Sequence, residues 1–289
     1  MIDNTRYDYS AIIERPPLRW PDNARVALWV IPNIEHFKID AGAGASAPDV
    51  RNHGLRDYGA RVGIWRVMET LDRYGVRGTV ALNGEVCQRY PIIMQEAMRR
   101  RWAFMGHGMT NSVRLTNMPV DEERRIIRET MAAIREATGA APKGWLGPGL
   151  TETMETPDIL AEEGIQCLCD WCADDQPFPM KVRQGSLLSI PYSLELNDLP
   201  AMAGKGISPD DFYRMCCDQF DTLYAEGAAT GRVMAIALHP FIIGQPFRIK
   251  ALDRTLSYIT GHKEVWVTTG DEIADWYLAQ GTVLARASP

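Results

Sequence analysis

The 289-residue chain lacks the features that mark several common protein classes. It has no run of about 18 apolar residues, so no membrane span is expected. Its N-terminus does not join a basic segment to an apolar one, so no secretory signal is expected. The net charge is −6 and the pI is about 5.5, which argues against nucleic-acid binding because that function needs a basic face. We therefore expect a cytoplasmic protein whose partner is a small molecule.

Common cofactor and nucleophile motifs are also missing. No GxGxxG or GxxxxGK[ST] follows a predicted strand, so nucleotide binding has no support. No GxSxG is present, so a serine nucleophile has no motif either. The six cysteines include one CxxC pair, Cys169 and Cys172, without a second pair. We expect these thiols to be reduced and to pack like small apolar groups.

Strand and helix patterns alternate along the chain. Predicted strands span 25–31, 78–82, 102–105, 144–146, 165–169, 186–191, 232–238 and 265–268, and predicted helices span 58–74, 88–101, 121–138, 156–163, 208–227, 249–260 and 270–278. Such alternation favours an α/β fold with parallel strands covered by helices, with a barrel preferred over an open doubly wound sheet. One domain, 1–289, is predicted, with an N-terminal arm at 1–24, a loop at 39–48 near the first strand end, and a long loop at about 170–206 on the site face.

Three of the five histidines directly follow predicted strands: His36, His107 and His239. In a barrel of parallel strands the carboxyl ends meet on one face, which is where active sites lie. Glu35 stands beside His36 and could bind a metal or activate water. His36 itself is expected to point the other way, because neighbouring residues on an extended chain alternate between faces.

The block around His107 reads GHGMTNS. Glycines on both sides of His107 let the backbone bend and leave room near the ring. If a helical turn follows, Asn111 faces the same way as His107, at the spacing of a pair of metal ligands. His239 ends an apolar strand and is well placed to protonate a leaving nitrogen. The alternative for His107 and His239 is a purely structural role, in which each ring is buried and its hydrogen bonds are satisfied within the protein.

Further candidates lie at other strand ends. Asp170 could orient a catalytic histidine or bind substrate, and the turn GWLGPG could form a pocket wall or offer N–H groups to an oxyanion. The alternative is a tight turn without contact to substrate. The predicted substrate-binding residues, which would line a compact and partly apolar pocket, are Trp145, Pro148, Trp171, Asn111 and Phe241.

Taken in order, the blocks RPPLRWPDNARVALWV, NIEHF, DYGARVG, GHGMTNS, GWLGPG and ALHP resemble the NodB-homology domain of polysaccharide deacetylases (carbohydrate esterase family 4), and most closely its allantoinase-like branch. The resemblance covers about Arg25 to Trp276. It implies a distorted (β/α)7 barrel that hydrolyses a C–N bond with an activated water and no covalent intermediate. It also implies a homo-oligomer, a dimer or a tetramer.

The same resemblance implies roles for individual residues. Glu35 falls at the acidic block, His107 at the first metal histidine, Asn111 where a second one would stand, and His239 at the general acid. The chain departs from the family in having one carboxylate instead of an Asp-Asp pair, in Asn111, and in lacking the usual Arg of the third block. Two mechanisms stay open. Either Glu35, His107 and Asn111 hold a divalent ion such as Zn²⁺, which lowers the pKa of its water to ~7, or Glu35 is the base without metal and His107 polarises the carbonyl.

Three functions follow from these residues. The leading one is hydrolysis of a non-peptide C–N bond in a small linear or cyclic amide, ureide or imide. The second is deacetylation of N-acetyl sugars or polysaccharides. The third is a catalytically inactive barrel that serves as a binding subunit.

Overall fold

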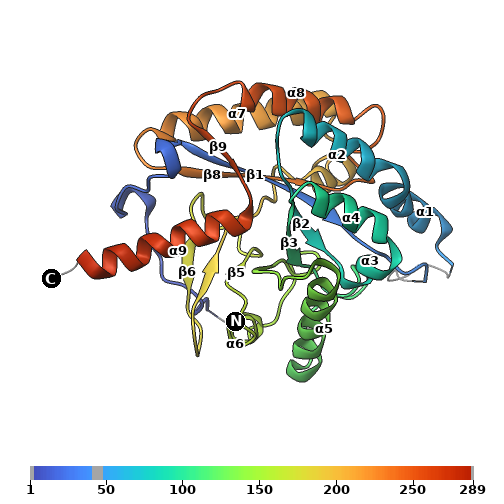
Figure 1. The fold of residues 1–289 in the computed structure, drawn as a ribbon, viewed down its shortest axis with the longest axis horizontal. Helices are drawn as coiled ribbons and strands as arrows, with labels where there is room; N and C mark the ends of the chain where they lie inside the picture. The colour runs from blue at the N-terminus through green and yellow to red at the C-terminus, as the bar shows by residue number, and fades with distance from the viewer. Residues whose placement is uncertain (1–2, 41–47, 288–289) are drawn as a thin grey trace.

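The computed structural model describes residues 3–40 and 48–287, leaving out the side chains of 281–287, and shows a parallel sheet wrapped by helices (Figure 1). The predicted loop at 39–48 lies largely outside the described residues. The strands are β1 Val26–Ile34, β2 Thr79–Leu82, β3 Ala103–Gly106, β4 Gly144–Trp145, β5 Cys167–Leu168, β6 Phe178–Met180, β7 Leu187–Ser189, β8 Arg232–Leu238 and β9 Val265–Thr268. The α-helices are α1 Val50–Tyr58, α2 Ile64–Arg73, α3 Gly84–Arg89, α4 Pro91–Arg99, α5 Val120–Thr138, α6 Thr156–Glu162, α7 Pro209–Gly227, α8 Ile249–Thr260 and α9 Gly270–Ala287. Two π-helical segments, η3 Gly59–Gly63 and η4 Leu199–Gly204, and two 3-10 turns, η1 Ile12–Glu14 and η2 Pro21–Asn23, complete the elements.

The strands run in the order β6-β7-β5-β4-β3-β2-β1-β8, and every neighbouring pair is parallel except β6 with β7. β8 follows one edge of β1, while β9 and β2 share the other edge. β9 pairs with Val26–Trp29, and β2 pairs only with Asn33 and Ile34. The sheet therefore splays between β1 and β2. This α/β half-barrel confirms the predicted distorted barrel.

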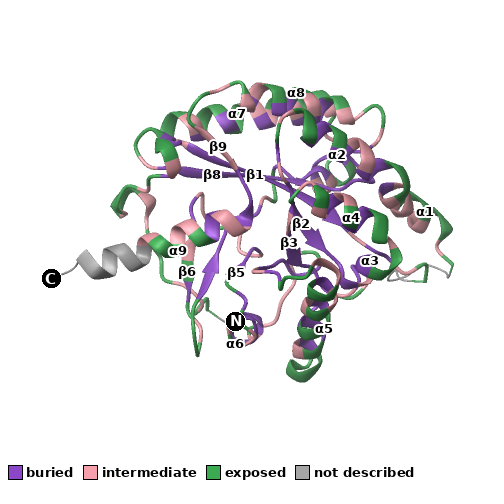
Figure 2. Cartoon of the chain, viewed as in Figure 1, coloured by how far each residue is buried: buried purple, intermediate pink, exposed green. Residues whose placement is uncertain are grey.

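Both faces of the sheet are buried (Figure 2), which explains why β1 reads as a continuous apolar run. Alternate residues of β1 enter different cores. Val26, Leu28 and Val30 pack outward under the helices, whereas Trp29 and Ile31 pack inward with residues from β7 and β8. Burying two layers of side chains in this way is what stabilises the curved sheet.

Helix boundaries differ from the sequence prediction in three main places, one of them the predicted helix 270–278, which continues as α9 to Ala287. The predicted helix 58–74 begins earlier, because α1, η3 and α2 form one helical run from Val50; the polar composition of α1 gave no apolar stripe to reveal it. The predicted helix 88–101 is divided by Pro91, which starts α4, since proline lacks an N–H and clashes with the preceding turn.

The region 170–206 is not one loop. It contains the hairpin β6–β7 and the π-helical segment η4, and β7 joins the parallel sheet beside β5. Backbone hydrogen bonds then cross the remaining gap to β8: Val233 N–H donates to Asp175 O at 2.8 Å and Ala237 N–H donates to Leu196 O at 2.9 Å. This region therefore closes the open side of the half-barrel.

Two glycines in DYGARVG fix how the α1–η3–α2 run meets β8. A Cβ at Gly59 would approach Phe241 N to 2.8 Å, and a Cβ at Gly63 would collide with the Pro240 carbonyl oxygen. Only glycine permits this backbone approach. The run is thereby held directly against the residues that follow His239, which places α1 at the edge of the candidate site.

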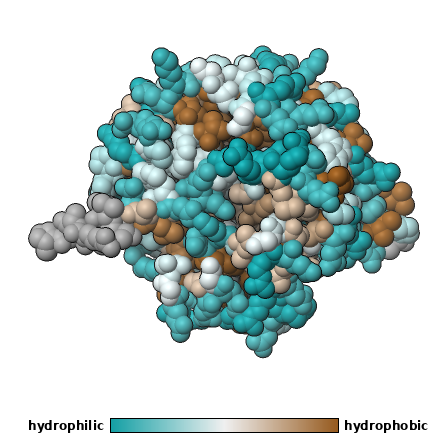
Figure 3. Space-filling model, in the orientation of Figure 1, coloured by the Kyte–Doolittle hydropathy of each residue, from teal (hydrophilic) through white to brown (hydrophobic). Residues whose placement is uncertain are grey.

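The N-terminal arm packs on the body of the protein. Trp20 lies against Trp266 and Trp276, with ring centroids 5.7 and 5.0 Å apart, and its Nε1 donates to Arg232 O at 2.9 Å. Among the described residues, no helix combines the length and apolar character that crossing a bilayer requires. The face shown in Figure 3 is mostly hydrophilic, with its apolar residues in separate patches.

Candidate active site

The loops that follow β1 and β3 are tied together by side-chain amides and hydroxyls. Asn83, just after β2, accepts from His36 N–H at 2.9 Å and donates to His107 O. Thr110 Oγ1 and Asn111 N–H both donate to His36 O at 2.9 Å. Gly108, with φ of 68°, makes the bend that this arrangement needs, and a Cβ there would meet Pro148 Cγ at 2.7 Å. The backbone is thus fixed on either side of Glu35 and His107.

Glu35 lies at the centre of the candidate site, and its side chain is 3% exposed. Its Oε1 accepts from Asn111 Nδ2 at 2.6 Å, lies 3.3 Å from His107 Nε2 and lies 3.8 Å from His239 Nε2. Its Oε2 is buried and has no hydrogen-bond partner among the described residues. The structure therefore brings together Glu35, His107, Asn111 and His239, and leaves one carboxylate oxygen open.

His107 is oriented by a backbone carbonyl. Its Nδ1 donates to Leu146 O at 2.6 Å. With that hydrogen on Nδ1, Nε2 can donate to Glu35 only when the ring carries both protons. A doubly protonated ring at this place would present positive charge to an oxygen bound beside Glu35.

His239 is oriented by Asp198, a residue that the sequence analysis missed. His239 Nδ1 donates to Asp198 Oδ1 at 2.8 Å, and the same carboxylate accepts the N–H groups of His239 and Ile243. Asp198 is fully buried and lies just before η4. The tautomer and direction of His239 are set by this contact, which leaves Nε2 facing Glu35.

The charges of this cluster depend on one another. Burial would raise the pKa of Glu35, but His239, His107 and Arg56 outweigh burial and hold that pKa below its ordinary value. Burial would likewise lower the pKa of His239, but Glu35 and Asp198 outweigh it and raise that pKa above its ordinary value. The cluster therefore favours the ionised form of Glu35 and the protonated form of His239, each relative to the free side chain.

Arg56 is a second residue that the sequence analysis missed, because it lies on the unpredicted α1. Its guanidinium is stacked between two rings, with Cζ 3.6 Å from the centroid of Phe37 and 4.9 Å from that of Phe241. Its Nε donates to Asn52 Oδ1 at 3.0 Å, while its Nη1 is buried and has no partner among the described residues.

Two small cavities adjoin Glu35 and Arg56. One is bounded by Asn33, Pro240 and Phe241 and the other by Phe37 and Tyr90, and each has a volume of about 10 Å³. That volume is close to the smallest that holds a single water molecule. Glu35 lines both cavities, so a water in either one would lie close to its side chain.

The residues present do not fit a divalent-metal site. Asn111 turns Nδ2 toward Glu35, and its Oδ1 accepts from Arg114 Nη1 at 3.4 Å, so its oxygen points away from the would-be ion. Only Glu35 and His107 then remain as ligands, and a guanidinium lies close by. No group of three or more His, Cys, Asp or Glu residues suited to a metal ion occurs in the described part of the chain. In this arrangement Asn111 presents its amide nitrogen to Glu35, and its role as a metal ligand stays a prediction.

Three predictions for the strand ends of β4 and β5 need correction. Trp145 does not line a pocket: it is fully buried beneath α5 and α6 with Ile126 and Ile159, because alternation along β4 turns Leu146 inward instead. The N–H of Gly147 is not available to an oxyanion, since it donates to Asp170 Oδ1 at 2.8 Å. Asp170 is therefore engaged at this turn and does not orient a histidine. The carboxylate that contacts His239 is Asp198.

The other predicted substrate-binding residues lie in different surroundings. Phe241 packs against His239 with ring centroids 5.6 Å apart, so it borders the cluster. Pro148 is buried against Gly108, where it supports the His107 loop. Trp171 packs on Tyr7 of the arm at 5.5 Å between centroids. Substrate contact by these three residues stays a prediction.

His36 points away from Glu35, as expected. Its Nδ1 lies 3.3 Å from Tyr90 Oη and its Nε2 lies 3.6 Å from Glu85 Oε2. The six cysteines are free thiols, which confirms the expectation from their spacing, and burial raises the pKa of Cys172 to about 12. These groups therefore lie outside the catalytic cluster.

A pair of carboxyl groups, Glu152 and Asp170, lies behind the GWLGPG turn. Burial, together with the charges of Asp170 and Glu123, raises the pKa of Glu152 to about 9, and burial raises that of Asp170 to about 7. One oxygen of each has no hydrogen-bond partner among the described residues. Near neutral pH this pair therefore keeps at least one proton.

This pair predicts that the protein loses stability as pH rises. Glu152 holds its proton up to about pH 9 when folded but only to about 4.5 when unfolded, so unfolding releases a proton in that window. The free energy of unfolding should fall on the order of 1 kcal/mol per pH unit between pH 6 and 9. The variant Glu152→Gln should flatten the decline in melting temperature over this range. An unchanged slope in the variant would contradict the assignment.

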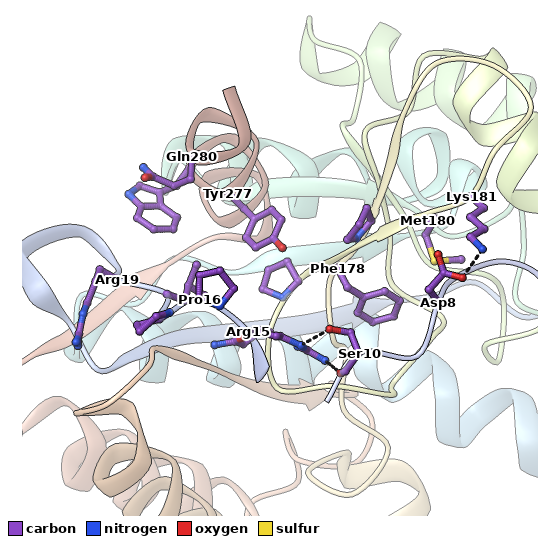
Figure 4. Close-up of a pocket in the computed structure, with 16 residues that line it drawn as sticks. Asp8, Ser10, Arg15, Pro16, Arg19, Phe178, Met180, Lys181, Tyr277 and Gln280 are labelled. Atoms are coloured by element: carbon purple, nitrogen blue, oxygen red, sulfur yellow. Dashed lines mark hydrogen bonds and ion pairs between the residues drawn. The ribbon is translucent and has the colours of Figure 1, made fainter. Parts of the chain in front are cut away.

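A larger cavity of about 590 Å³ lies elsewhere, between the arm, β6 and α9 (Figure 4). Pro16, Phe178 and Tyr277 contribute to its mostly apolar wall, and Arg15 at its edge is paired with Asp174 at 2.5 Å. No member of the Glu35 cluster lines it. Cavity size alone therefore does not identify the catalytic centre in this protein.

A buried carboxylate with one unpartnered oxygen lies between two imidazoles at the carboxyl ends of the strands of a half-barrel, an arrangement suited to activating a water for hydrolysis. Comparison with known proteins places the chain among hydrolases of this fold. The polysaccharide deacetylase family profile matches residues 56–168. Over that region the chain is similar to the polysaccharide deacetylase (NodB-homology, carbohydrate esterase 4) family, and it is a hydrolase acting on C–N bonds.

Individual relatives match along most of the chain. A Schizosaccharomyces pombe protein whose name marks it as a polysaccharide deacetylase is 27% identical, covering 90% of this chain and 92% of the relative. The peptidoglycan deacetylase of Helicobacter pylori is 25% identical, covering 81% and 89%. The solved structure of PuuE allantoinase is 28% identical with a TM-score of 0.87, covering 96% and 98%.

Proposed function

We propose that this protein hydrolyses a small linear or cyclic amide, ureide or imide by direct attack of a water that Glu35 activates. The observation that carries the proposal is the open oxygen of Glu35. Oε1 is occupied by Asn111 and the two histidines, whereas Oε2 is buried and has no partner among the described residues, and Glu35 lines a cavity of about the size of one water. A carboxylate held ionised in such a place is suited to accept a proton from water.

The steps follow from the orientation of each group. The water oxygen attacks the carbonyl carbon while its proton passes to Glu35 Oε2. His107 faces the same space and stabilises the charge that forms on the carbonyl oxygen. As the C–N bond breaks, the leaving nitrogen takes the proton of His239 Nε2, and until then Asp198 stabilises the protonated ring. Residues 1–289 act in this proposal as one catalytic domain.

Two substrate classes are supported to different degrees. The likeness to an allantoinase over nearly the whole of both chains favours a compact substrate. The names of the two deacetylase relatives favour an N-acetyl sugar, which is the second candidate. Both substrates present an amide-type carbonyl to the same water, so the Glu35 chemistry is common to them.

The test is a substrate panel assayed with the purified protein, with and without a metal chelator. Cyclic ureides, imides, linear ureides and N-acetyl-chitooligosaccharides would be compared by following ammonia, acid or acetate release. We expect turnover of a small ureide, amide or imide that survives chelation. Acetate release from the oligosaccharides alone would support the second candidate, and absence of turnover throughout would overturn both.

A further inference from the structure

We propose that Arg56 binds an oxygen anion of the substrate through the guanidinium nitrogen Nη1. The inference rests on the proposed function, because it assigns a ligand to the same site. It identifies α1, a helix that carries none of the predicted site residues, as the element that supplies a charge to the reaction.

The position of Arg56 is built by two motifs that also hold catalytic candidates. Phe37 comes from NIEHF, two residues after Glu35, and Phe241 follows His239 by two residues. Their rings clamp the guanidinium from two sides, and Asn52 fixes its Nε. The planar group is therefore held rigid before any ligand arrives, which reduces the entropy lost on binding.

The guanidinium has no matching carboxylate at hydrogen-bond distance within the described residues. A buried cation of this kind carries a desolvation cost, and burial lowers the pKa of Arg56 although the charge of Glu35 opposes that effect. The rings of Phe37 and Phe241 compensate only in part. Arg56, whose Nη1 is unpaired, and Glu35 line the same two cavities, so a group bound there would lie beside both residues.

The charges of the cluster favour an anion as that group. Glu35 and Asp198 carry two negative charges, which Arg56 and Arg114 match, and Arg114 is held beside the cluster by Asn111. A proton on His239 adds a positive charge, and a second proton on His107 would add another. An oxygen anion beside Arg56 would offset this positive charge through a charge-assisted hydrogen bond.

Two sources can supply this oxygen anion. It is either a permanent group of the substrate, such as a carboxylate or an ionised imide oxygen, or the oxyanion that forms when water attacks the carbonyl. A permanent anion is bound in the ground state, so losing Arg56 raises KM. A transient oxyanion is bound only during reaction, so losing Arg56 lowers kcat.

The test pairs binding with kinetics in Arg56→Gln and Arg56→Lys. Binding of acetate and of methylphosphonate, a stable tetrahedral anion, would be measured by calorimetry or NMR titration. We expect at least one to bind the wild-type protein and to bind about 10-fold or more weakly to Arg56→Gln. Arg56→Lys should retain part of the binding, since it keeps the charge but loses the planar fork.

Arg61→Gln is the matched control, because Arg61 lies on the same helical run, is 73% exposed and pairs only loosely with Asp57 at 3.5 Å. It should behave as wild type. Anion binding and kinetics in Arg56→Gln that match those of Arg61→Gln, with folding intact by circular dichroism, would overturn the proposal. The titration needs no turnover, so it still decides the role of Arg56 if the substrate panel fails.

Discussion

Replacing Glu35 by Gln is expected to lower kcat by about 10²- to 10⁴-fold, the range that a positioned general base contributes. Gln keeps the size of the side chain and an oxygen that accepts from Asn111, but it has no basic oxygen for the proton of water. KM should change little, because the loss concerns the attacking water and not the bound substrate. The measurement is steady-state kinetics on the substrate found in the panel.

The pH dependence of the rate is a second test of Glu35 as the general base. Because the pKa of Glu35 lies below its ordinary value of 4.5, the acid limb of kcat/KM should lie below pH 4.5 in the wild-type protein. Glu195→Gln is a suitable control, since that carboxylate is 74% exposed and pairs with Lys205 on the surface. Wild-type rates in Glu35→Gln would refute the base and, with it, the proposed mechanism.

Replacing Asp198 by Asn is expected to lower kcat by about 10²-fold or more, because the variant loses the charge that keeps His239 protonated. In the wild-type protein the pKa of His239 is raised above 6.5, so the alkaline limb of the rate profile should lie above pH 6.5. Without the Asp198 charge that limb should move to lower pH. A purely structural role for Asp198 would reduce stability without moving the limb.

Asp170→Asn provides the comparison for Asp198→Asn. Sequence analysis predicted that Asp170 orients a catalytic histidine, whereas the structure shows it accepting the Gly147 N–H. We expect its substitution to leave the alkaline limb in place. A shift in Asp170→Asn together with none in Asp198→Asn would reverse the two assignments.

The amino-acid sequence predicted most of the residues that converge. Glu35, His107 and His239 each follow an apolar strand pattern, and parallel strands bring their carboxyl ends to one face. This argument uses local pattern and topology only, and it succeeds because side-chain position at a strand end is fixed by the backbone. It also explains why His36, one residue beyond Glu35, was expected on the other side and lies there against Tyr90 and Glu85.

The residues that the sequence did not reveal are those whose partners depend on packing. Asp198 lies in a segment without helical or strand periodicity, and only the closure of β7 toward β8 brings it beneath His239. Arg56 lies on a polar helix, and only the glycine contact with Pro240 holds that helix at the site. Trp145 was assigned to the wrong side because its direction follows from the register of a two-residue strand.

By itself, then, the sequence determined the half-barrel, the likeness to polysaccharide deacetylases, and the carboxylate and imidazoles of the cluster, since periodicity and strand-end position are local properties. Only the tertiary structure determined that Asp198 is the carboxylate that orients His239 and that Arg56 is the cation beside Glu35. It also determined that Asn111 presents its amide nitrogen, and not its oxygen, to Glu35. Those outcomes depend on contacts between segments far apart in the chain, where distance, burial and the direction of single atoms determine the chemistry.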